Sequence, residues 1–263
     1  MRSLFAGVAV SVAWSVALDG GQAKPKMLVA VVAHPDDEGA VSPLLARYAR
    51  EGVAVHLIVA TDGAAGSKQT TVAAGAELAK VRADEARCAT DALGLSPPIL
   101  LGFPDGQLGN YAEDPLRLFR LTQRLHEELQ RLRPDALVTW GPDGGTGHPD
   151  HRLVGAVVTQ LARTAAPGVP DRLFYMSIPA EVMRAMNPRG EPPLLIPQAK
   201  HLTTRIAFSP ADLESARRSL GCHKTQFPPD ALARLADAAT KTWDGSVVVS
   251  PAFAAAPRDD LFR

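Results

Sequence analysis

MLVAVVAHPDDE, residues 27–38, joins a continuous apolar run to a cluster of polar residues. The apolar part, residues 27–33, is rich in valine, and such runs are typical of a strand that is buried on both faces of a parallel sheet. Pro35 cannot donate a hydrogen bond to a sheet and has a fixed φ, so it ends the strand and suits the first turn of a helix. The stretch therefore predicts a central strand with polar side chains at its carboxyl end.

The same arrangement recurs along the chain. A second apolar run, residues 53–60, ends at a Thr-Asp-Gly turn, and residues 42–51 between the two runs place apolar side chains at helical spacing. Further strands are predicted at residues 99–102, 136–140, 173–177 and 205–208, and further helices at 72–93, 115–132, 149–165 and 211–221. The alternation predicts a single α/β domain, a Rossmann-like, mostly parallel sheet with helices on both faces, whose strands end along one rim.

The regularity of this pattern changes along the domain, which we expect to span residues 24–263. Residues 27–165 form its core. Beyond Ala165 prolines become frequent, so long loops are expected there. Residues 166–263 are predicted to be an irregular C-terminal part, with a tail after Val249 that wraps the domain.

The composition excludes several classes of function. The 28 basic and 28 acidic residues cancel, so there is no electrostatic footprint for a nucleic acid. With 46% hydrophobic and 21% charged residues, the chain has the composition of a soluble globular protein. No glycine-rich turn follows the first strand, so no nucleotide cofactor is predicted. We expect a small-molecule or glycan substrate, and the sequence indicates no oligomeric state.

The two cysteines, Cys88 and Cys222, do not form a C-x-x-C pair. A thiolate zinc site is therefore not expected, and neither is a catalytic cysteine. Cys88 falls within a strongly helical segment, where we expect a buried free thiol in preference to a disulfide with Cys222.

The first 23 residues have the pattern of a secretory signal peptide. Arg2 precedes an apolar run, residues 4–18, and Gly21-Gln22-Ala23 is a plausible cleavage site. The run is short for a membrane span, which needs roughly 20 apolar residues. We expect export to the periplasm or the extracellular space with no membrane span left after cleavage, and an uncleaved anchor is the alternative.

The polar cluster after the first strand holds four groups able to bind a metal or move a proton: His34, Asp36, Asp37 and Glu38. His34 and Asp37 are three residues apart, so a turn brings their side chains to one side. Asp36 is then directed elsewhere. A hydrolytic zinc site needs a few nitrogen or oxygen ligands, an open position for water and a free base nearby, and this cluster offers that division of roles.

A second cluster, GHPDH at residues 147–151, follows the predicted strand at 136–140 and opens a predicted helix. Its two histidines, His148 and His151, are three residues apart. One of them can complete a His/Asp/His metal set, while the other stays free as an acid or as a group that polarises a carbonyl. His56 and His126 have no such neighbours and are assigned no role.

AHPDDE at 33–38 together with HPDH at 148–151 resembles the PIG-L (LmbE-like) family of zinc-dependent N-deacetylases. The resemblance covers about residues 27–165 well and the remainder weakly. It implies that zinc is bound by His34, Asp37 and His151. It also implies that Asp36 is the general base and that His148 polarises the amide carbonyl or protonates the leaving amine.

Other residues complete this site. Glu38 and Asp150 are predicted to orient the ligands and the base from behind. The family resemblance further implies that Arg82 and Asp105 contact the substrate, although Arg82 could also be an exposed helix charge and Asp105 a turn former before Gly106.

Two positions relate to the family pattern less directly. Some members carry a tyrosine two residues before the first histidine of the second motif, where this chain has Thr146. His223 and Gln226 fall near a C-terminal His-x-x-Gln pattern seen in some members.

The sequence therefore predicts a zinc-dependent hydrolase that removes an N-acyl group, in particular acetyl, from an amino sugar or glycoconjugate. A non-catalytic carbohydrate-binding protein of the same fold is one alternative. A metal-dependent phosphoesterase is another, although such enzymes generally use two metals and more carboxylates.

Overall fold

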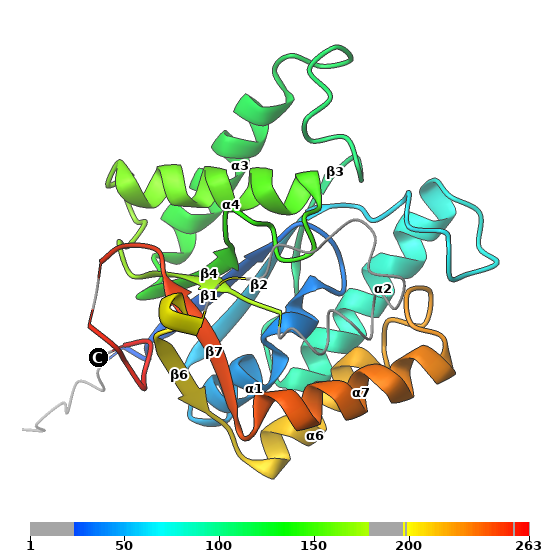
Figure 1. Ribbon diagram of the computed structural model, residues 1–263. Coiled ribbons are helices and arrows are strands. Elements are labelled where there is room, and N and C mark those ends of the chain that lie inside the picture. Colours follow the sequence, from blue (N-terminus) through cyan, green and yellow to red (C-terminus); the bar gives the residue numbers. More distant parts are fainter. Residues whose placement is uncertain (1–23, 179–196, 198, 255, 263) are drawn as a thin grey trace, which may run out of the picture.

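The computed structural model describes residues 24–178, 197, 199–254 and 256–262. A seven-stranded sheet with the order β3-β2-β1-β4-β5-β7-β6 lies at its centre (Figure 1). The strands are β1 (Met27–Val32), β2 (Ala54–Thr61), β3 (Ile99–Phe103), β4 (Ala136–Trp140), β5 (Leu173–Met176), β6 (Thr204–Ala207) and β7 (Ser246–Pro251). Strands β1 to β5 pair in parallel, whereas β7 is antiparallel to both β5 and β6. The predicted Rossmann-like, mostly parallel sheet is confirmed.

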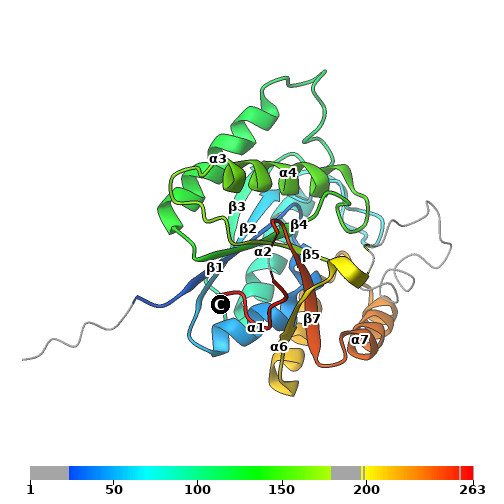
Figure 2. The same ribbon diagram turned by 60° about the vertical axis from the view of Figure 1, so that its left-hand side comes forward.

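Helices cover both faces of this sheet (Figures 1 and 2). The helices are η1 (Asp37–Ala40), α1 (Ser42–Arg50), α2 (Ala76–Leu93), α3 (Arg117–Leu132), α4 (Pro149–Arg163), η2 (Ala199–His201), α6 (Pro210–Leu220) and α7 (Pro229–Trp243). In both views α3 and α4 lie on one side of the sheet, and α1, α6 and α7 lie on the other. Two apolar cores result, one on each face.

Strand β1 explains why both faces need cover. Leu28, Ala30 and Val32 pack into one core. Val29 and Val31, which alternate with them, pack into the other. Successive side chains of a strand point to opposite faces, so an uninterrupted apolar run fits only a strand that is covered on both sides.

The position of β1 also determines where a ligand can bind. β1 lies between β2 and β4. The strands that follow β1 are added first on one side of it, as β2 and β3, and then on the other side, as β4 and β5. In open α/β sheets, ligands bind in the crevice beyond the carboxyl ends of the strands at such a switch point. The two polar motifs, at 34–38 and 147–151, follow β1 and β4 directly.

The C-terminal part of the chain contains more regular structure than its sequence indicates. Helix α7 and strand β7 are not among the predicted elements, and β7 runs to Pro251 in the sheet between β5 and β6. None of the helices within the described residues is long and apolar enough to cross a bilayer. The predicted signal peptide, residues 1–23, lies outside the described residues.

The expectation of a free thiol at Cys88 is wrong. Cys88 of α2 and Cys222, just after α6, form a disulfide with a Cα–Cα distance of 5.8 Å across 134 residues of sequence. The sequence pattern around Cys88 indicated a helix but not which other segment packs against that helix. Since α2 packs against α6, the tertiary structure brings the two sulfur atoms together.

Replacement of Cys222 by serine is expected to lower the free energy of unfolding by about 2–4 kcal/mol, because the disulfide restricts the unfolded chain. Urea unfolding followed by circular dichroism measures the change. Dithiothreitol should destabilise the parent by a similar amount and leave Cys222→Ser unchanged. Two titratable thiols in the native, non-reduced parent would contradict the disulfide.

Candidate active site

The loop after β1 turns sharply at Asp36, whose φ of 108° lies in the region that favours glycine. Such a conformation costs on the order of 1–3 kcal/mol and persists only where neighbouring groups hold it. The Arg82 guanidinium donates to the carbonyl of Pro35 and lies 3.3 Å from the Asp36 carboxylate. The Glu38 carboxylate accepts from the Asp36 backbone N–H at 3.1 Å. These contacts fix Asp36 from both sides.

One carboxylate oxygen of Asp37 accepts three hydrogen bonds, and the other faces His151. Its Oδ2 accepts from the backbone N–H groups of Ala33 and His34 and from Trp140 Nε1, at 3.0, 2.9 and 3.0 Å. Its Oδ1 lies 3.1 Å from His151 Nε2. Burial raises the pKa of Asp37, but the rings of His151 and His34 bring that pKa well below its usual range. Asp37 therefore offers a fixed, ionised oxygen at the centre of the site.

His151 is oriented so that one ring nitrogen faces the same point. Its Nδ1 donates to the carbonyl of Gly144 at 2.8 Å, which leaves the lone pair of Nε2 free. The ring stacks on Trp140, with the planes inclined by 2° and the centroids 4.5 Å apart. Thr146 Oγ1 lies 3.4 Å from Nδ1. Thr146 therefore adjoins the back of the His151 ring.

His148 occupies the N-cap of α4, and its Nδ1 accepts from the backbone N–H of Asp150 at 3.2 Å. In a neutral ring the proton is then on Nε2. Burial lowers the pKa of His148, and the nearby His34 and His151 lower it further. His148 is therefore a neutral hydrogen-bond donor beside the other two histidines.

Ligand atoms from three side chains converge beyond the ends of β1 and β4. His34 Nδ1 lies 3.1 Å from His151 Nε2 and 3.7 Å from Asp37 Oδ2, and His151 Nε2 lies 3.1 Å from Asp37 Oδ1. Tetrahedral zinc with bonds of about 2.0–2.2 Å separates its ligand atoms by about 3.3–3.6 Å. The two imidazole nitrogens and the Asp37 carboxylate, whose two oxygens each face one of the nitrogens, therefore lie at spacings close to those of a zinc site.

The charge around His34 supports the same assignment. Its Nε2 faces Asp105 Oδ1 at 3.1 Å and Asp150 Oδ2 at 3.5 Å, but it is buried without a regular hydrogen bond. Burial lowers the pKa of His34, but Asp105, Asp150 and Asp37 together raise it to about 12. Asp105 and Asp150 therefore hold the ring from its Nε2 side and leave Nδ1 facing His151 and Asp37.

Two acidic residues beside His34, Asp150 and Asp105, are held in place by backbone N–H groups. Asp150 accepts from the backbone N–H groups of Gly106 and Leu108 at 2.8 and 3.2 Å, so it ties α4 to the loop after β3. Asp105 Oδ2 accepts from the N–H of Ala65 at 3.0 Å. Both carboxylates face His34 Nε2, so Asp105 contacts a proposed ligand residue, and its contact with the substrate stays a prediction.

Arg82 is 2% exposed, so the alternative that it is an exposed helix charge is wrong. Besides its contacts at Pro35 and Asp36, it donates to the carbonyl of Gly63 at 3.0 Å. A side chain added at Gly63 would lie 2.7 Å from the guanidinium, so the loop after β2 needs glycine there. Arg82 thereby joins the loops that follow β1 and β2.

Residues from the C-terminal part complete the back of the site. His223 Nε2 lies 2.6 Å from Glu38 Oε1, and both side chains are fully buried. Burial lowers the pKa of His223, but the Glu38 carboxylate raises it above its ordinary value. Gln226 donates to the carbonyl of Gly66 at 2.8 Å. Only the loose His-x-x-Gln pattern in the sequence indicated His223 and Gln226. Nothing in the sequence indicated a role for Trp140, which reads as one more apolar residue of a strand.

The model of one protein family, described as GlcNAc-PI de-N-acetylase (PIG-L), matches residues 29–162. The chain is 35% identical over 241 residues to the 1D-myo-inositol 2-acetamido-2-deoxy-alpha-D-glucopyranoside deacetylase of Rhodococcus jostii (strain RHA1), an alignment that covers 76% of this chain and 82% of the relative. It is 29% identical over 245 residues to deacetylase 2 of the same description from Catenulispora acidiphila, over 78% of this chain and 81% of the relative.

A solved structure with the same fold is the N,N'-diacetylchitobiose deacetylase from Pyrococcus horikoshii. It superimposes with a TM-score of 0.61 at 19% identity and covers 86% of this chain and 84% of its own. At this identity, the likeness shows the fold alone.

Metal binding tests the three-ligand set. The parent should hold about one equivalent of divalent metal after dialysis, and Asp37→Ala or His151→Ala should reduce the affinity by at least tenfold. His201→Ala, which changes an exposed histidine outside the site, is the control. Mass spectrometry of the bound metal and competition with a chelator give the stoichiometry and affinity. Full metal content in Asp37→Ala would contradict the assignment.

Replacement of His223 by alanine tests the support behind Asp36. It leaves the buried Glu38 carboxylate without its partner, which is expected to cost about 3 kcal/mol or more in the free energy of unfolding. His223→Gln, which retains an N–H donor, should recover part of this loss. Equal stability of the alanine variant and the parent in urea unfolding would show that the pair does not hold this loop.

Proposed function

Because the chain belongs to the GlcNAc-PI de-N-acetylase (PIG-L) family, we propose that it is a zinc-dependent hydrolase that removes an N-acyl group, such as acetyl, from an amino sugar or glycoconjugate. The observation that carries the proposal is the convergence of His34, Asp37 and His151 beside two groups that a purely structural metal site does not need. These are the carboxylate of Asp36 and the neutral ring of His148. The relatives are named as amino-sugar deacetylases.

His34, Asp37 and His151 would hold the metal. When bound there, zinc supplies Lewis acidity, which brings the pKa of water to about 7 and polarises a carbonyl group. The general base and the hydrogen-bond donor that an amide hydrolase also needs then come from the chain itself.

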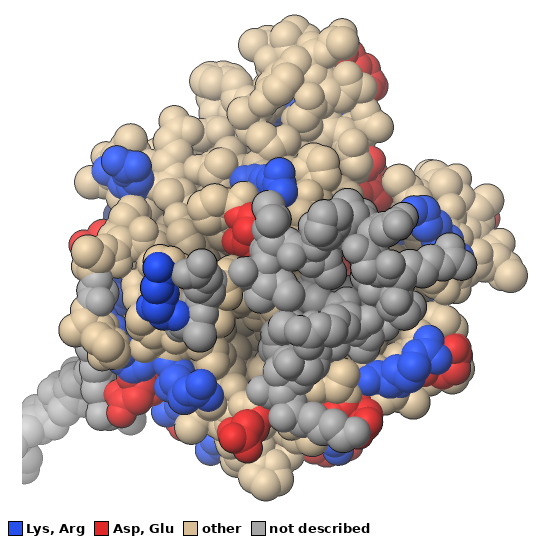
Figure 3. Space-filling model, viewed as in Figure 1, with Lys and Arg blue, Asp and Glu red and all other residues tan. Residues whose placement is uncertain are grey.

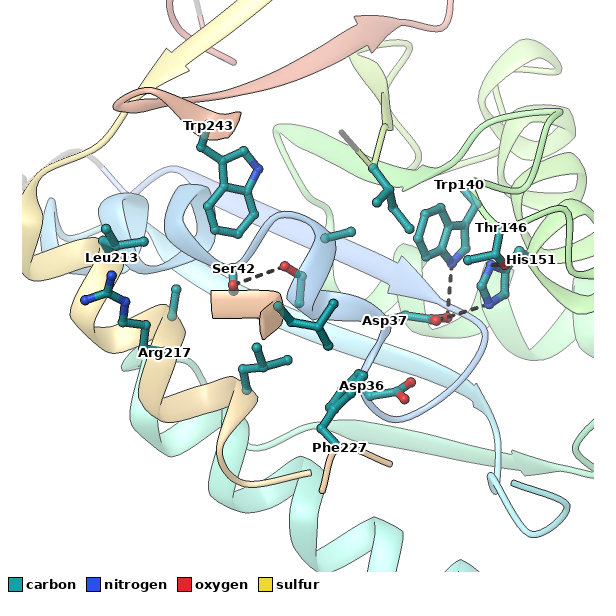
Figure 4. A pocket seen from close by; sticks show the side chains of 16 residues that line it. Asp36, Asp37, Ser42, Trp140, Thr146, His151, Leu213, Arg217, Phe227 and Trp243 are labelled. Carbon is teal, nitrogen blue, oxygen red and sulfur yellow. Dashed lines mark hydrogen bonds and ion pairs between the residues drawn. The ribbon is translucent and has the colours of Figure 1, made fainter. Parts of the chain in front are cut away.

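Asp36 acts as the general base. Burial raises the pKa of Asp36 to about 6, although the Arg82 guanidinium opposes that rise, so its carboxylate is ionised at neutral pH and still basic enough to accept a proton. Its side chain borders the same cavity as Asp37 and His151 (Figure 4). Asp36 takes a proton from the attacking water and can return it to the leaving amine.

His148 stabilises the charge that develops on the carbonyl oxygen. Its neutral ring, with the proton on Nε2, can donate a hydrogen bond to that oxygen as it becomes negative. The ring centroid lies 4.6 Å from that of His34 and 5.1 Å from that of His151. Because the Asp150 N–H fixes the other nitrogen, the donor is oriented before the substrate arrives.

One observation favours a second candidate function, a two-metal phosphoesterase. His34, Asp105 and Asp150 form another group whose potential ligand atoms lie within 4.8 Å of one another. The Asp150 oxygens, however, already accept from Gly106 and Leu108, and Asp105 Oδ2 accepts from Ala65. A single metal per chain supports the deacylase, and two per chain would favour the phosphoesterase.

We also propose that the protein is exported. The apolar run at residues 4–18 after Arg2 supports this, and so does the Cys88–Cys222 disulfide, because such bonds persist in oxidising compartments. On the face in Figure 3, basic and acidic side chains are interspersed. Mass spectrometry of the protein recovered from the periplasm or medium should find an N-terminus at Lys24, and a chain that stays in the cytoplasm with Met1 intact would overturn the proposal.

Asp36→Asn separates catalysis from metal binding. The variant should keep its metal and lose about 10²–10⁴-fold in turnover, the usual contribution of a general base. His34→Ala should lose both metal and activity, and His201→Ala neither. Release of free amine from N-acetylglucosamine derivatives by the zinc-loaded protein measures the rate. Turnover of Asp36→Asn at the parent rate would refute the assigned base.

A further inference from the structure

An apolar cavity of about 120 Å³ opens from the catalytic groups toward the C-terminal helices (Figure 4). At one end it is bordered by Asp36, Asp37 and His151. At the other it is lined by apolar side chains from α6, α7 and the segment between them: Leu213, Ala216, Leu220, Phe227, Leu235 and Trp243. Figure 4 shows Trp243 and Leu213 on the side opposite Trp140 and His151. The cavity is therefore continuous with the place where the scissile carbonyl must lie.

The polar atoms that border the far part of this cavity are few and mostly engaged. Ser42 Oγ donates to the carbonyl of Gly39 at 3.3 Å. The exposed Arg217 donates to Thr240 Oγ1 at 2.8 Å. Trp243 Nε1 is buried and has no hydrogen-bond partner among the described residues. A sugar ring, whose hydroxyl groups each need a partner when buried, does not fit such a lining.

An alkyl chain fits it well. A cavity of about 150 Å³ lined by aliphatic and aromatic side chains stays dry and binds a molecule the size of benzene, so a cavity of about 120 Å³ suits a short alkyl chain. Each methylene moved from water into such a lining strengthens binding by about fourfold. Polar residues such as Ser67, Lys68 and Gln69, on the loop after β2, are not among those that line the cavity.

We propose that this cavity holds the acyl chain of the substrate, and that the protein hydrolyses N-acyl amino sugars with linear chains of about four to six carbons in preference to N-acetyl ones. The proposal rests on the proposed hydrolase function and names the acyl group which that site takes. Water adds to the amide carbonyl carbon, the C–N bond breaks, and the products are the free amine and a short-chain carboxylate. Ala216 lines the cavity with a small side chain and is 3% exposed, so a larger side chain there would take up part of the cavity.

The test uses the zinc-loaded full chain with N-acetyl-, N-butanoyl-, N-hexanoyl- and N-octanoylglucosamine. The kcat/KM for amine release should rise at least tenfold from acetyl to hexanoyl and stop rising at octanoyl. Ala216→Leu should remove this gain, so that its kcat/KM for the hexanoyl compound no longer exceeds that for the acetyl compound. Ala211→Leu, an exposed position on the same helix that does not line the cavity, is the matched control and should keep the parent pattern.

A binding measurement and a second variant guard against a misfolded Ala216→Leu. Hexanoate should inhibit the parent at a concentration at least tenfold lower than acetate does. Leu220→Ala, which enlarges the cavity, should move the preferred chain from hexanoyl toward octanoyl. A circular dichroism melt of each variant shows whether it is folded.

The outcomes separate the two proposals. Hydrolysis of N-acetylglucosamine as fast as or faster than the hexanoyl compound would overturn the acyl-chain proposal and leave the deacetylase function standing. An Ala211→Leu effect equal to that of Ala216→Leu would also overturn it. If the metal-loaded parent cleaves no member of the series, both the hydrolase function and the acyl-chain proposal fail.

Discussion

The arrangement of the site depends on one carboxylate oxygen. Asp37 Oδ2 accepts from two backbone N–H groups at the end of β1 and from the indole of Trp140 at the end of β4. It therefore links β1 to β4, the two strands between which the order of strands in the sheet reverses. Because this oxygen is held by three donors, the second oxygen of the same group is fixed toward His151. The relative position of β1 and β4 thus determines where the proposed metal ligand Asp37 Oδ1 lies.

The strained position of Asp36 is the second constraint, and distant parts of the chain maintain it. Arg82 from α2 holds the carbonyl before it and faces its carboxylate. Glu38 holds its backbone N–H and is in turn paired with His223, which directly follows the disulfide-bonded Cys222. An unfavoured backbone conformation such as that of Asp36 persists because contacts with the surrounding residues hold it.

The proposed catalytic groups and the proposed acyl-binding cavity come from different parts of the fold. The proposed ligands, base and polarising group follow β1 and β4, inside the segment that matches the family model. The apolar wall of the cavity comes from α6, Phe227 and α7, beyond that segment.

The sequence by itself determined the alternating strands and helices up to Arg163 and the polar clusters that follow the parallel strands at one rim of the sheet. Those features are local, because strand burial, helical spacing and proline position act within a few residues. Only the tertiary structure decided that Cys88 meets Cys222, that Glu38 meets His223 and that Arg82 is buried beside Asp36. Such pairings depend on how α2, α6 and the last strands pack, and packing between distant segments leaves no periodic signal in the chain.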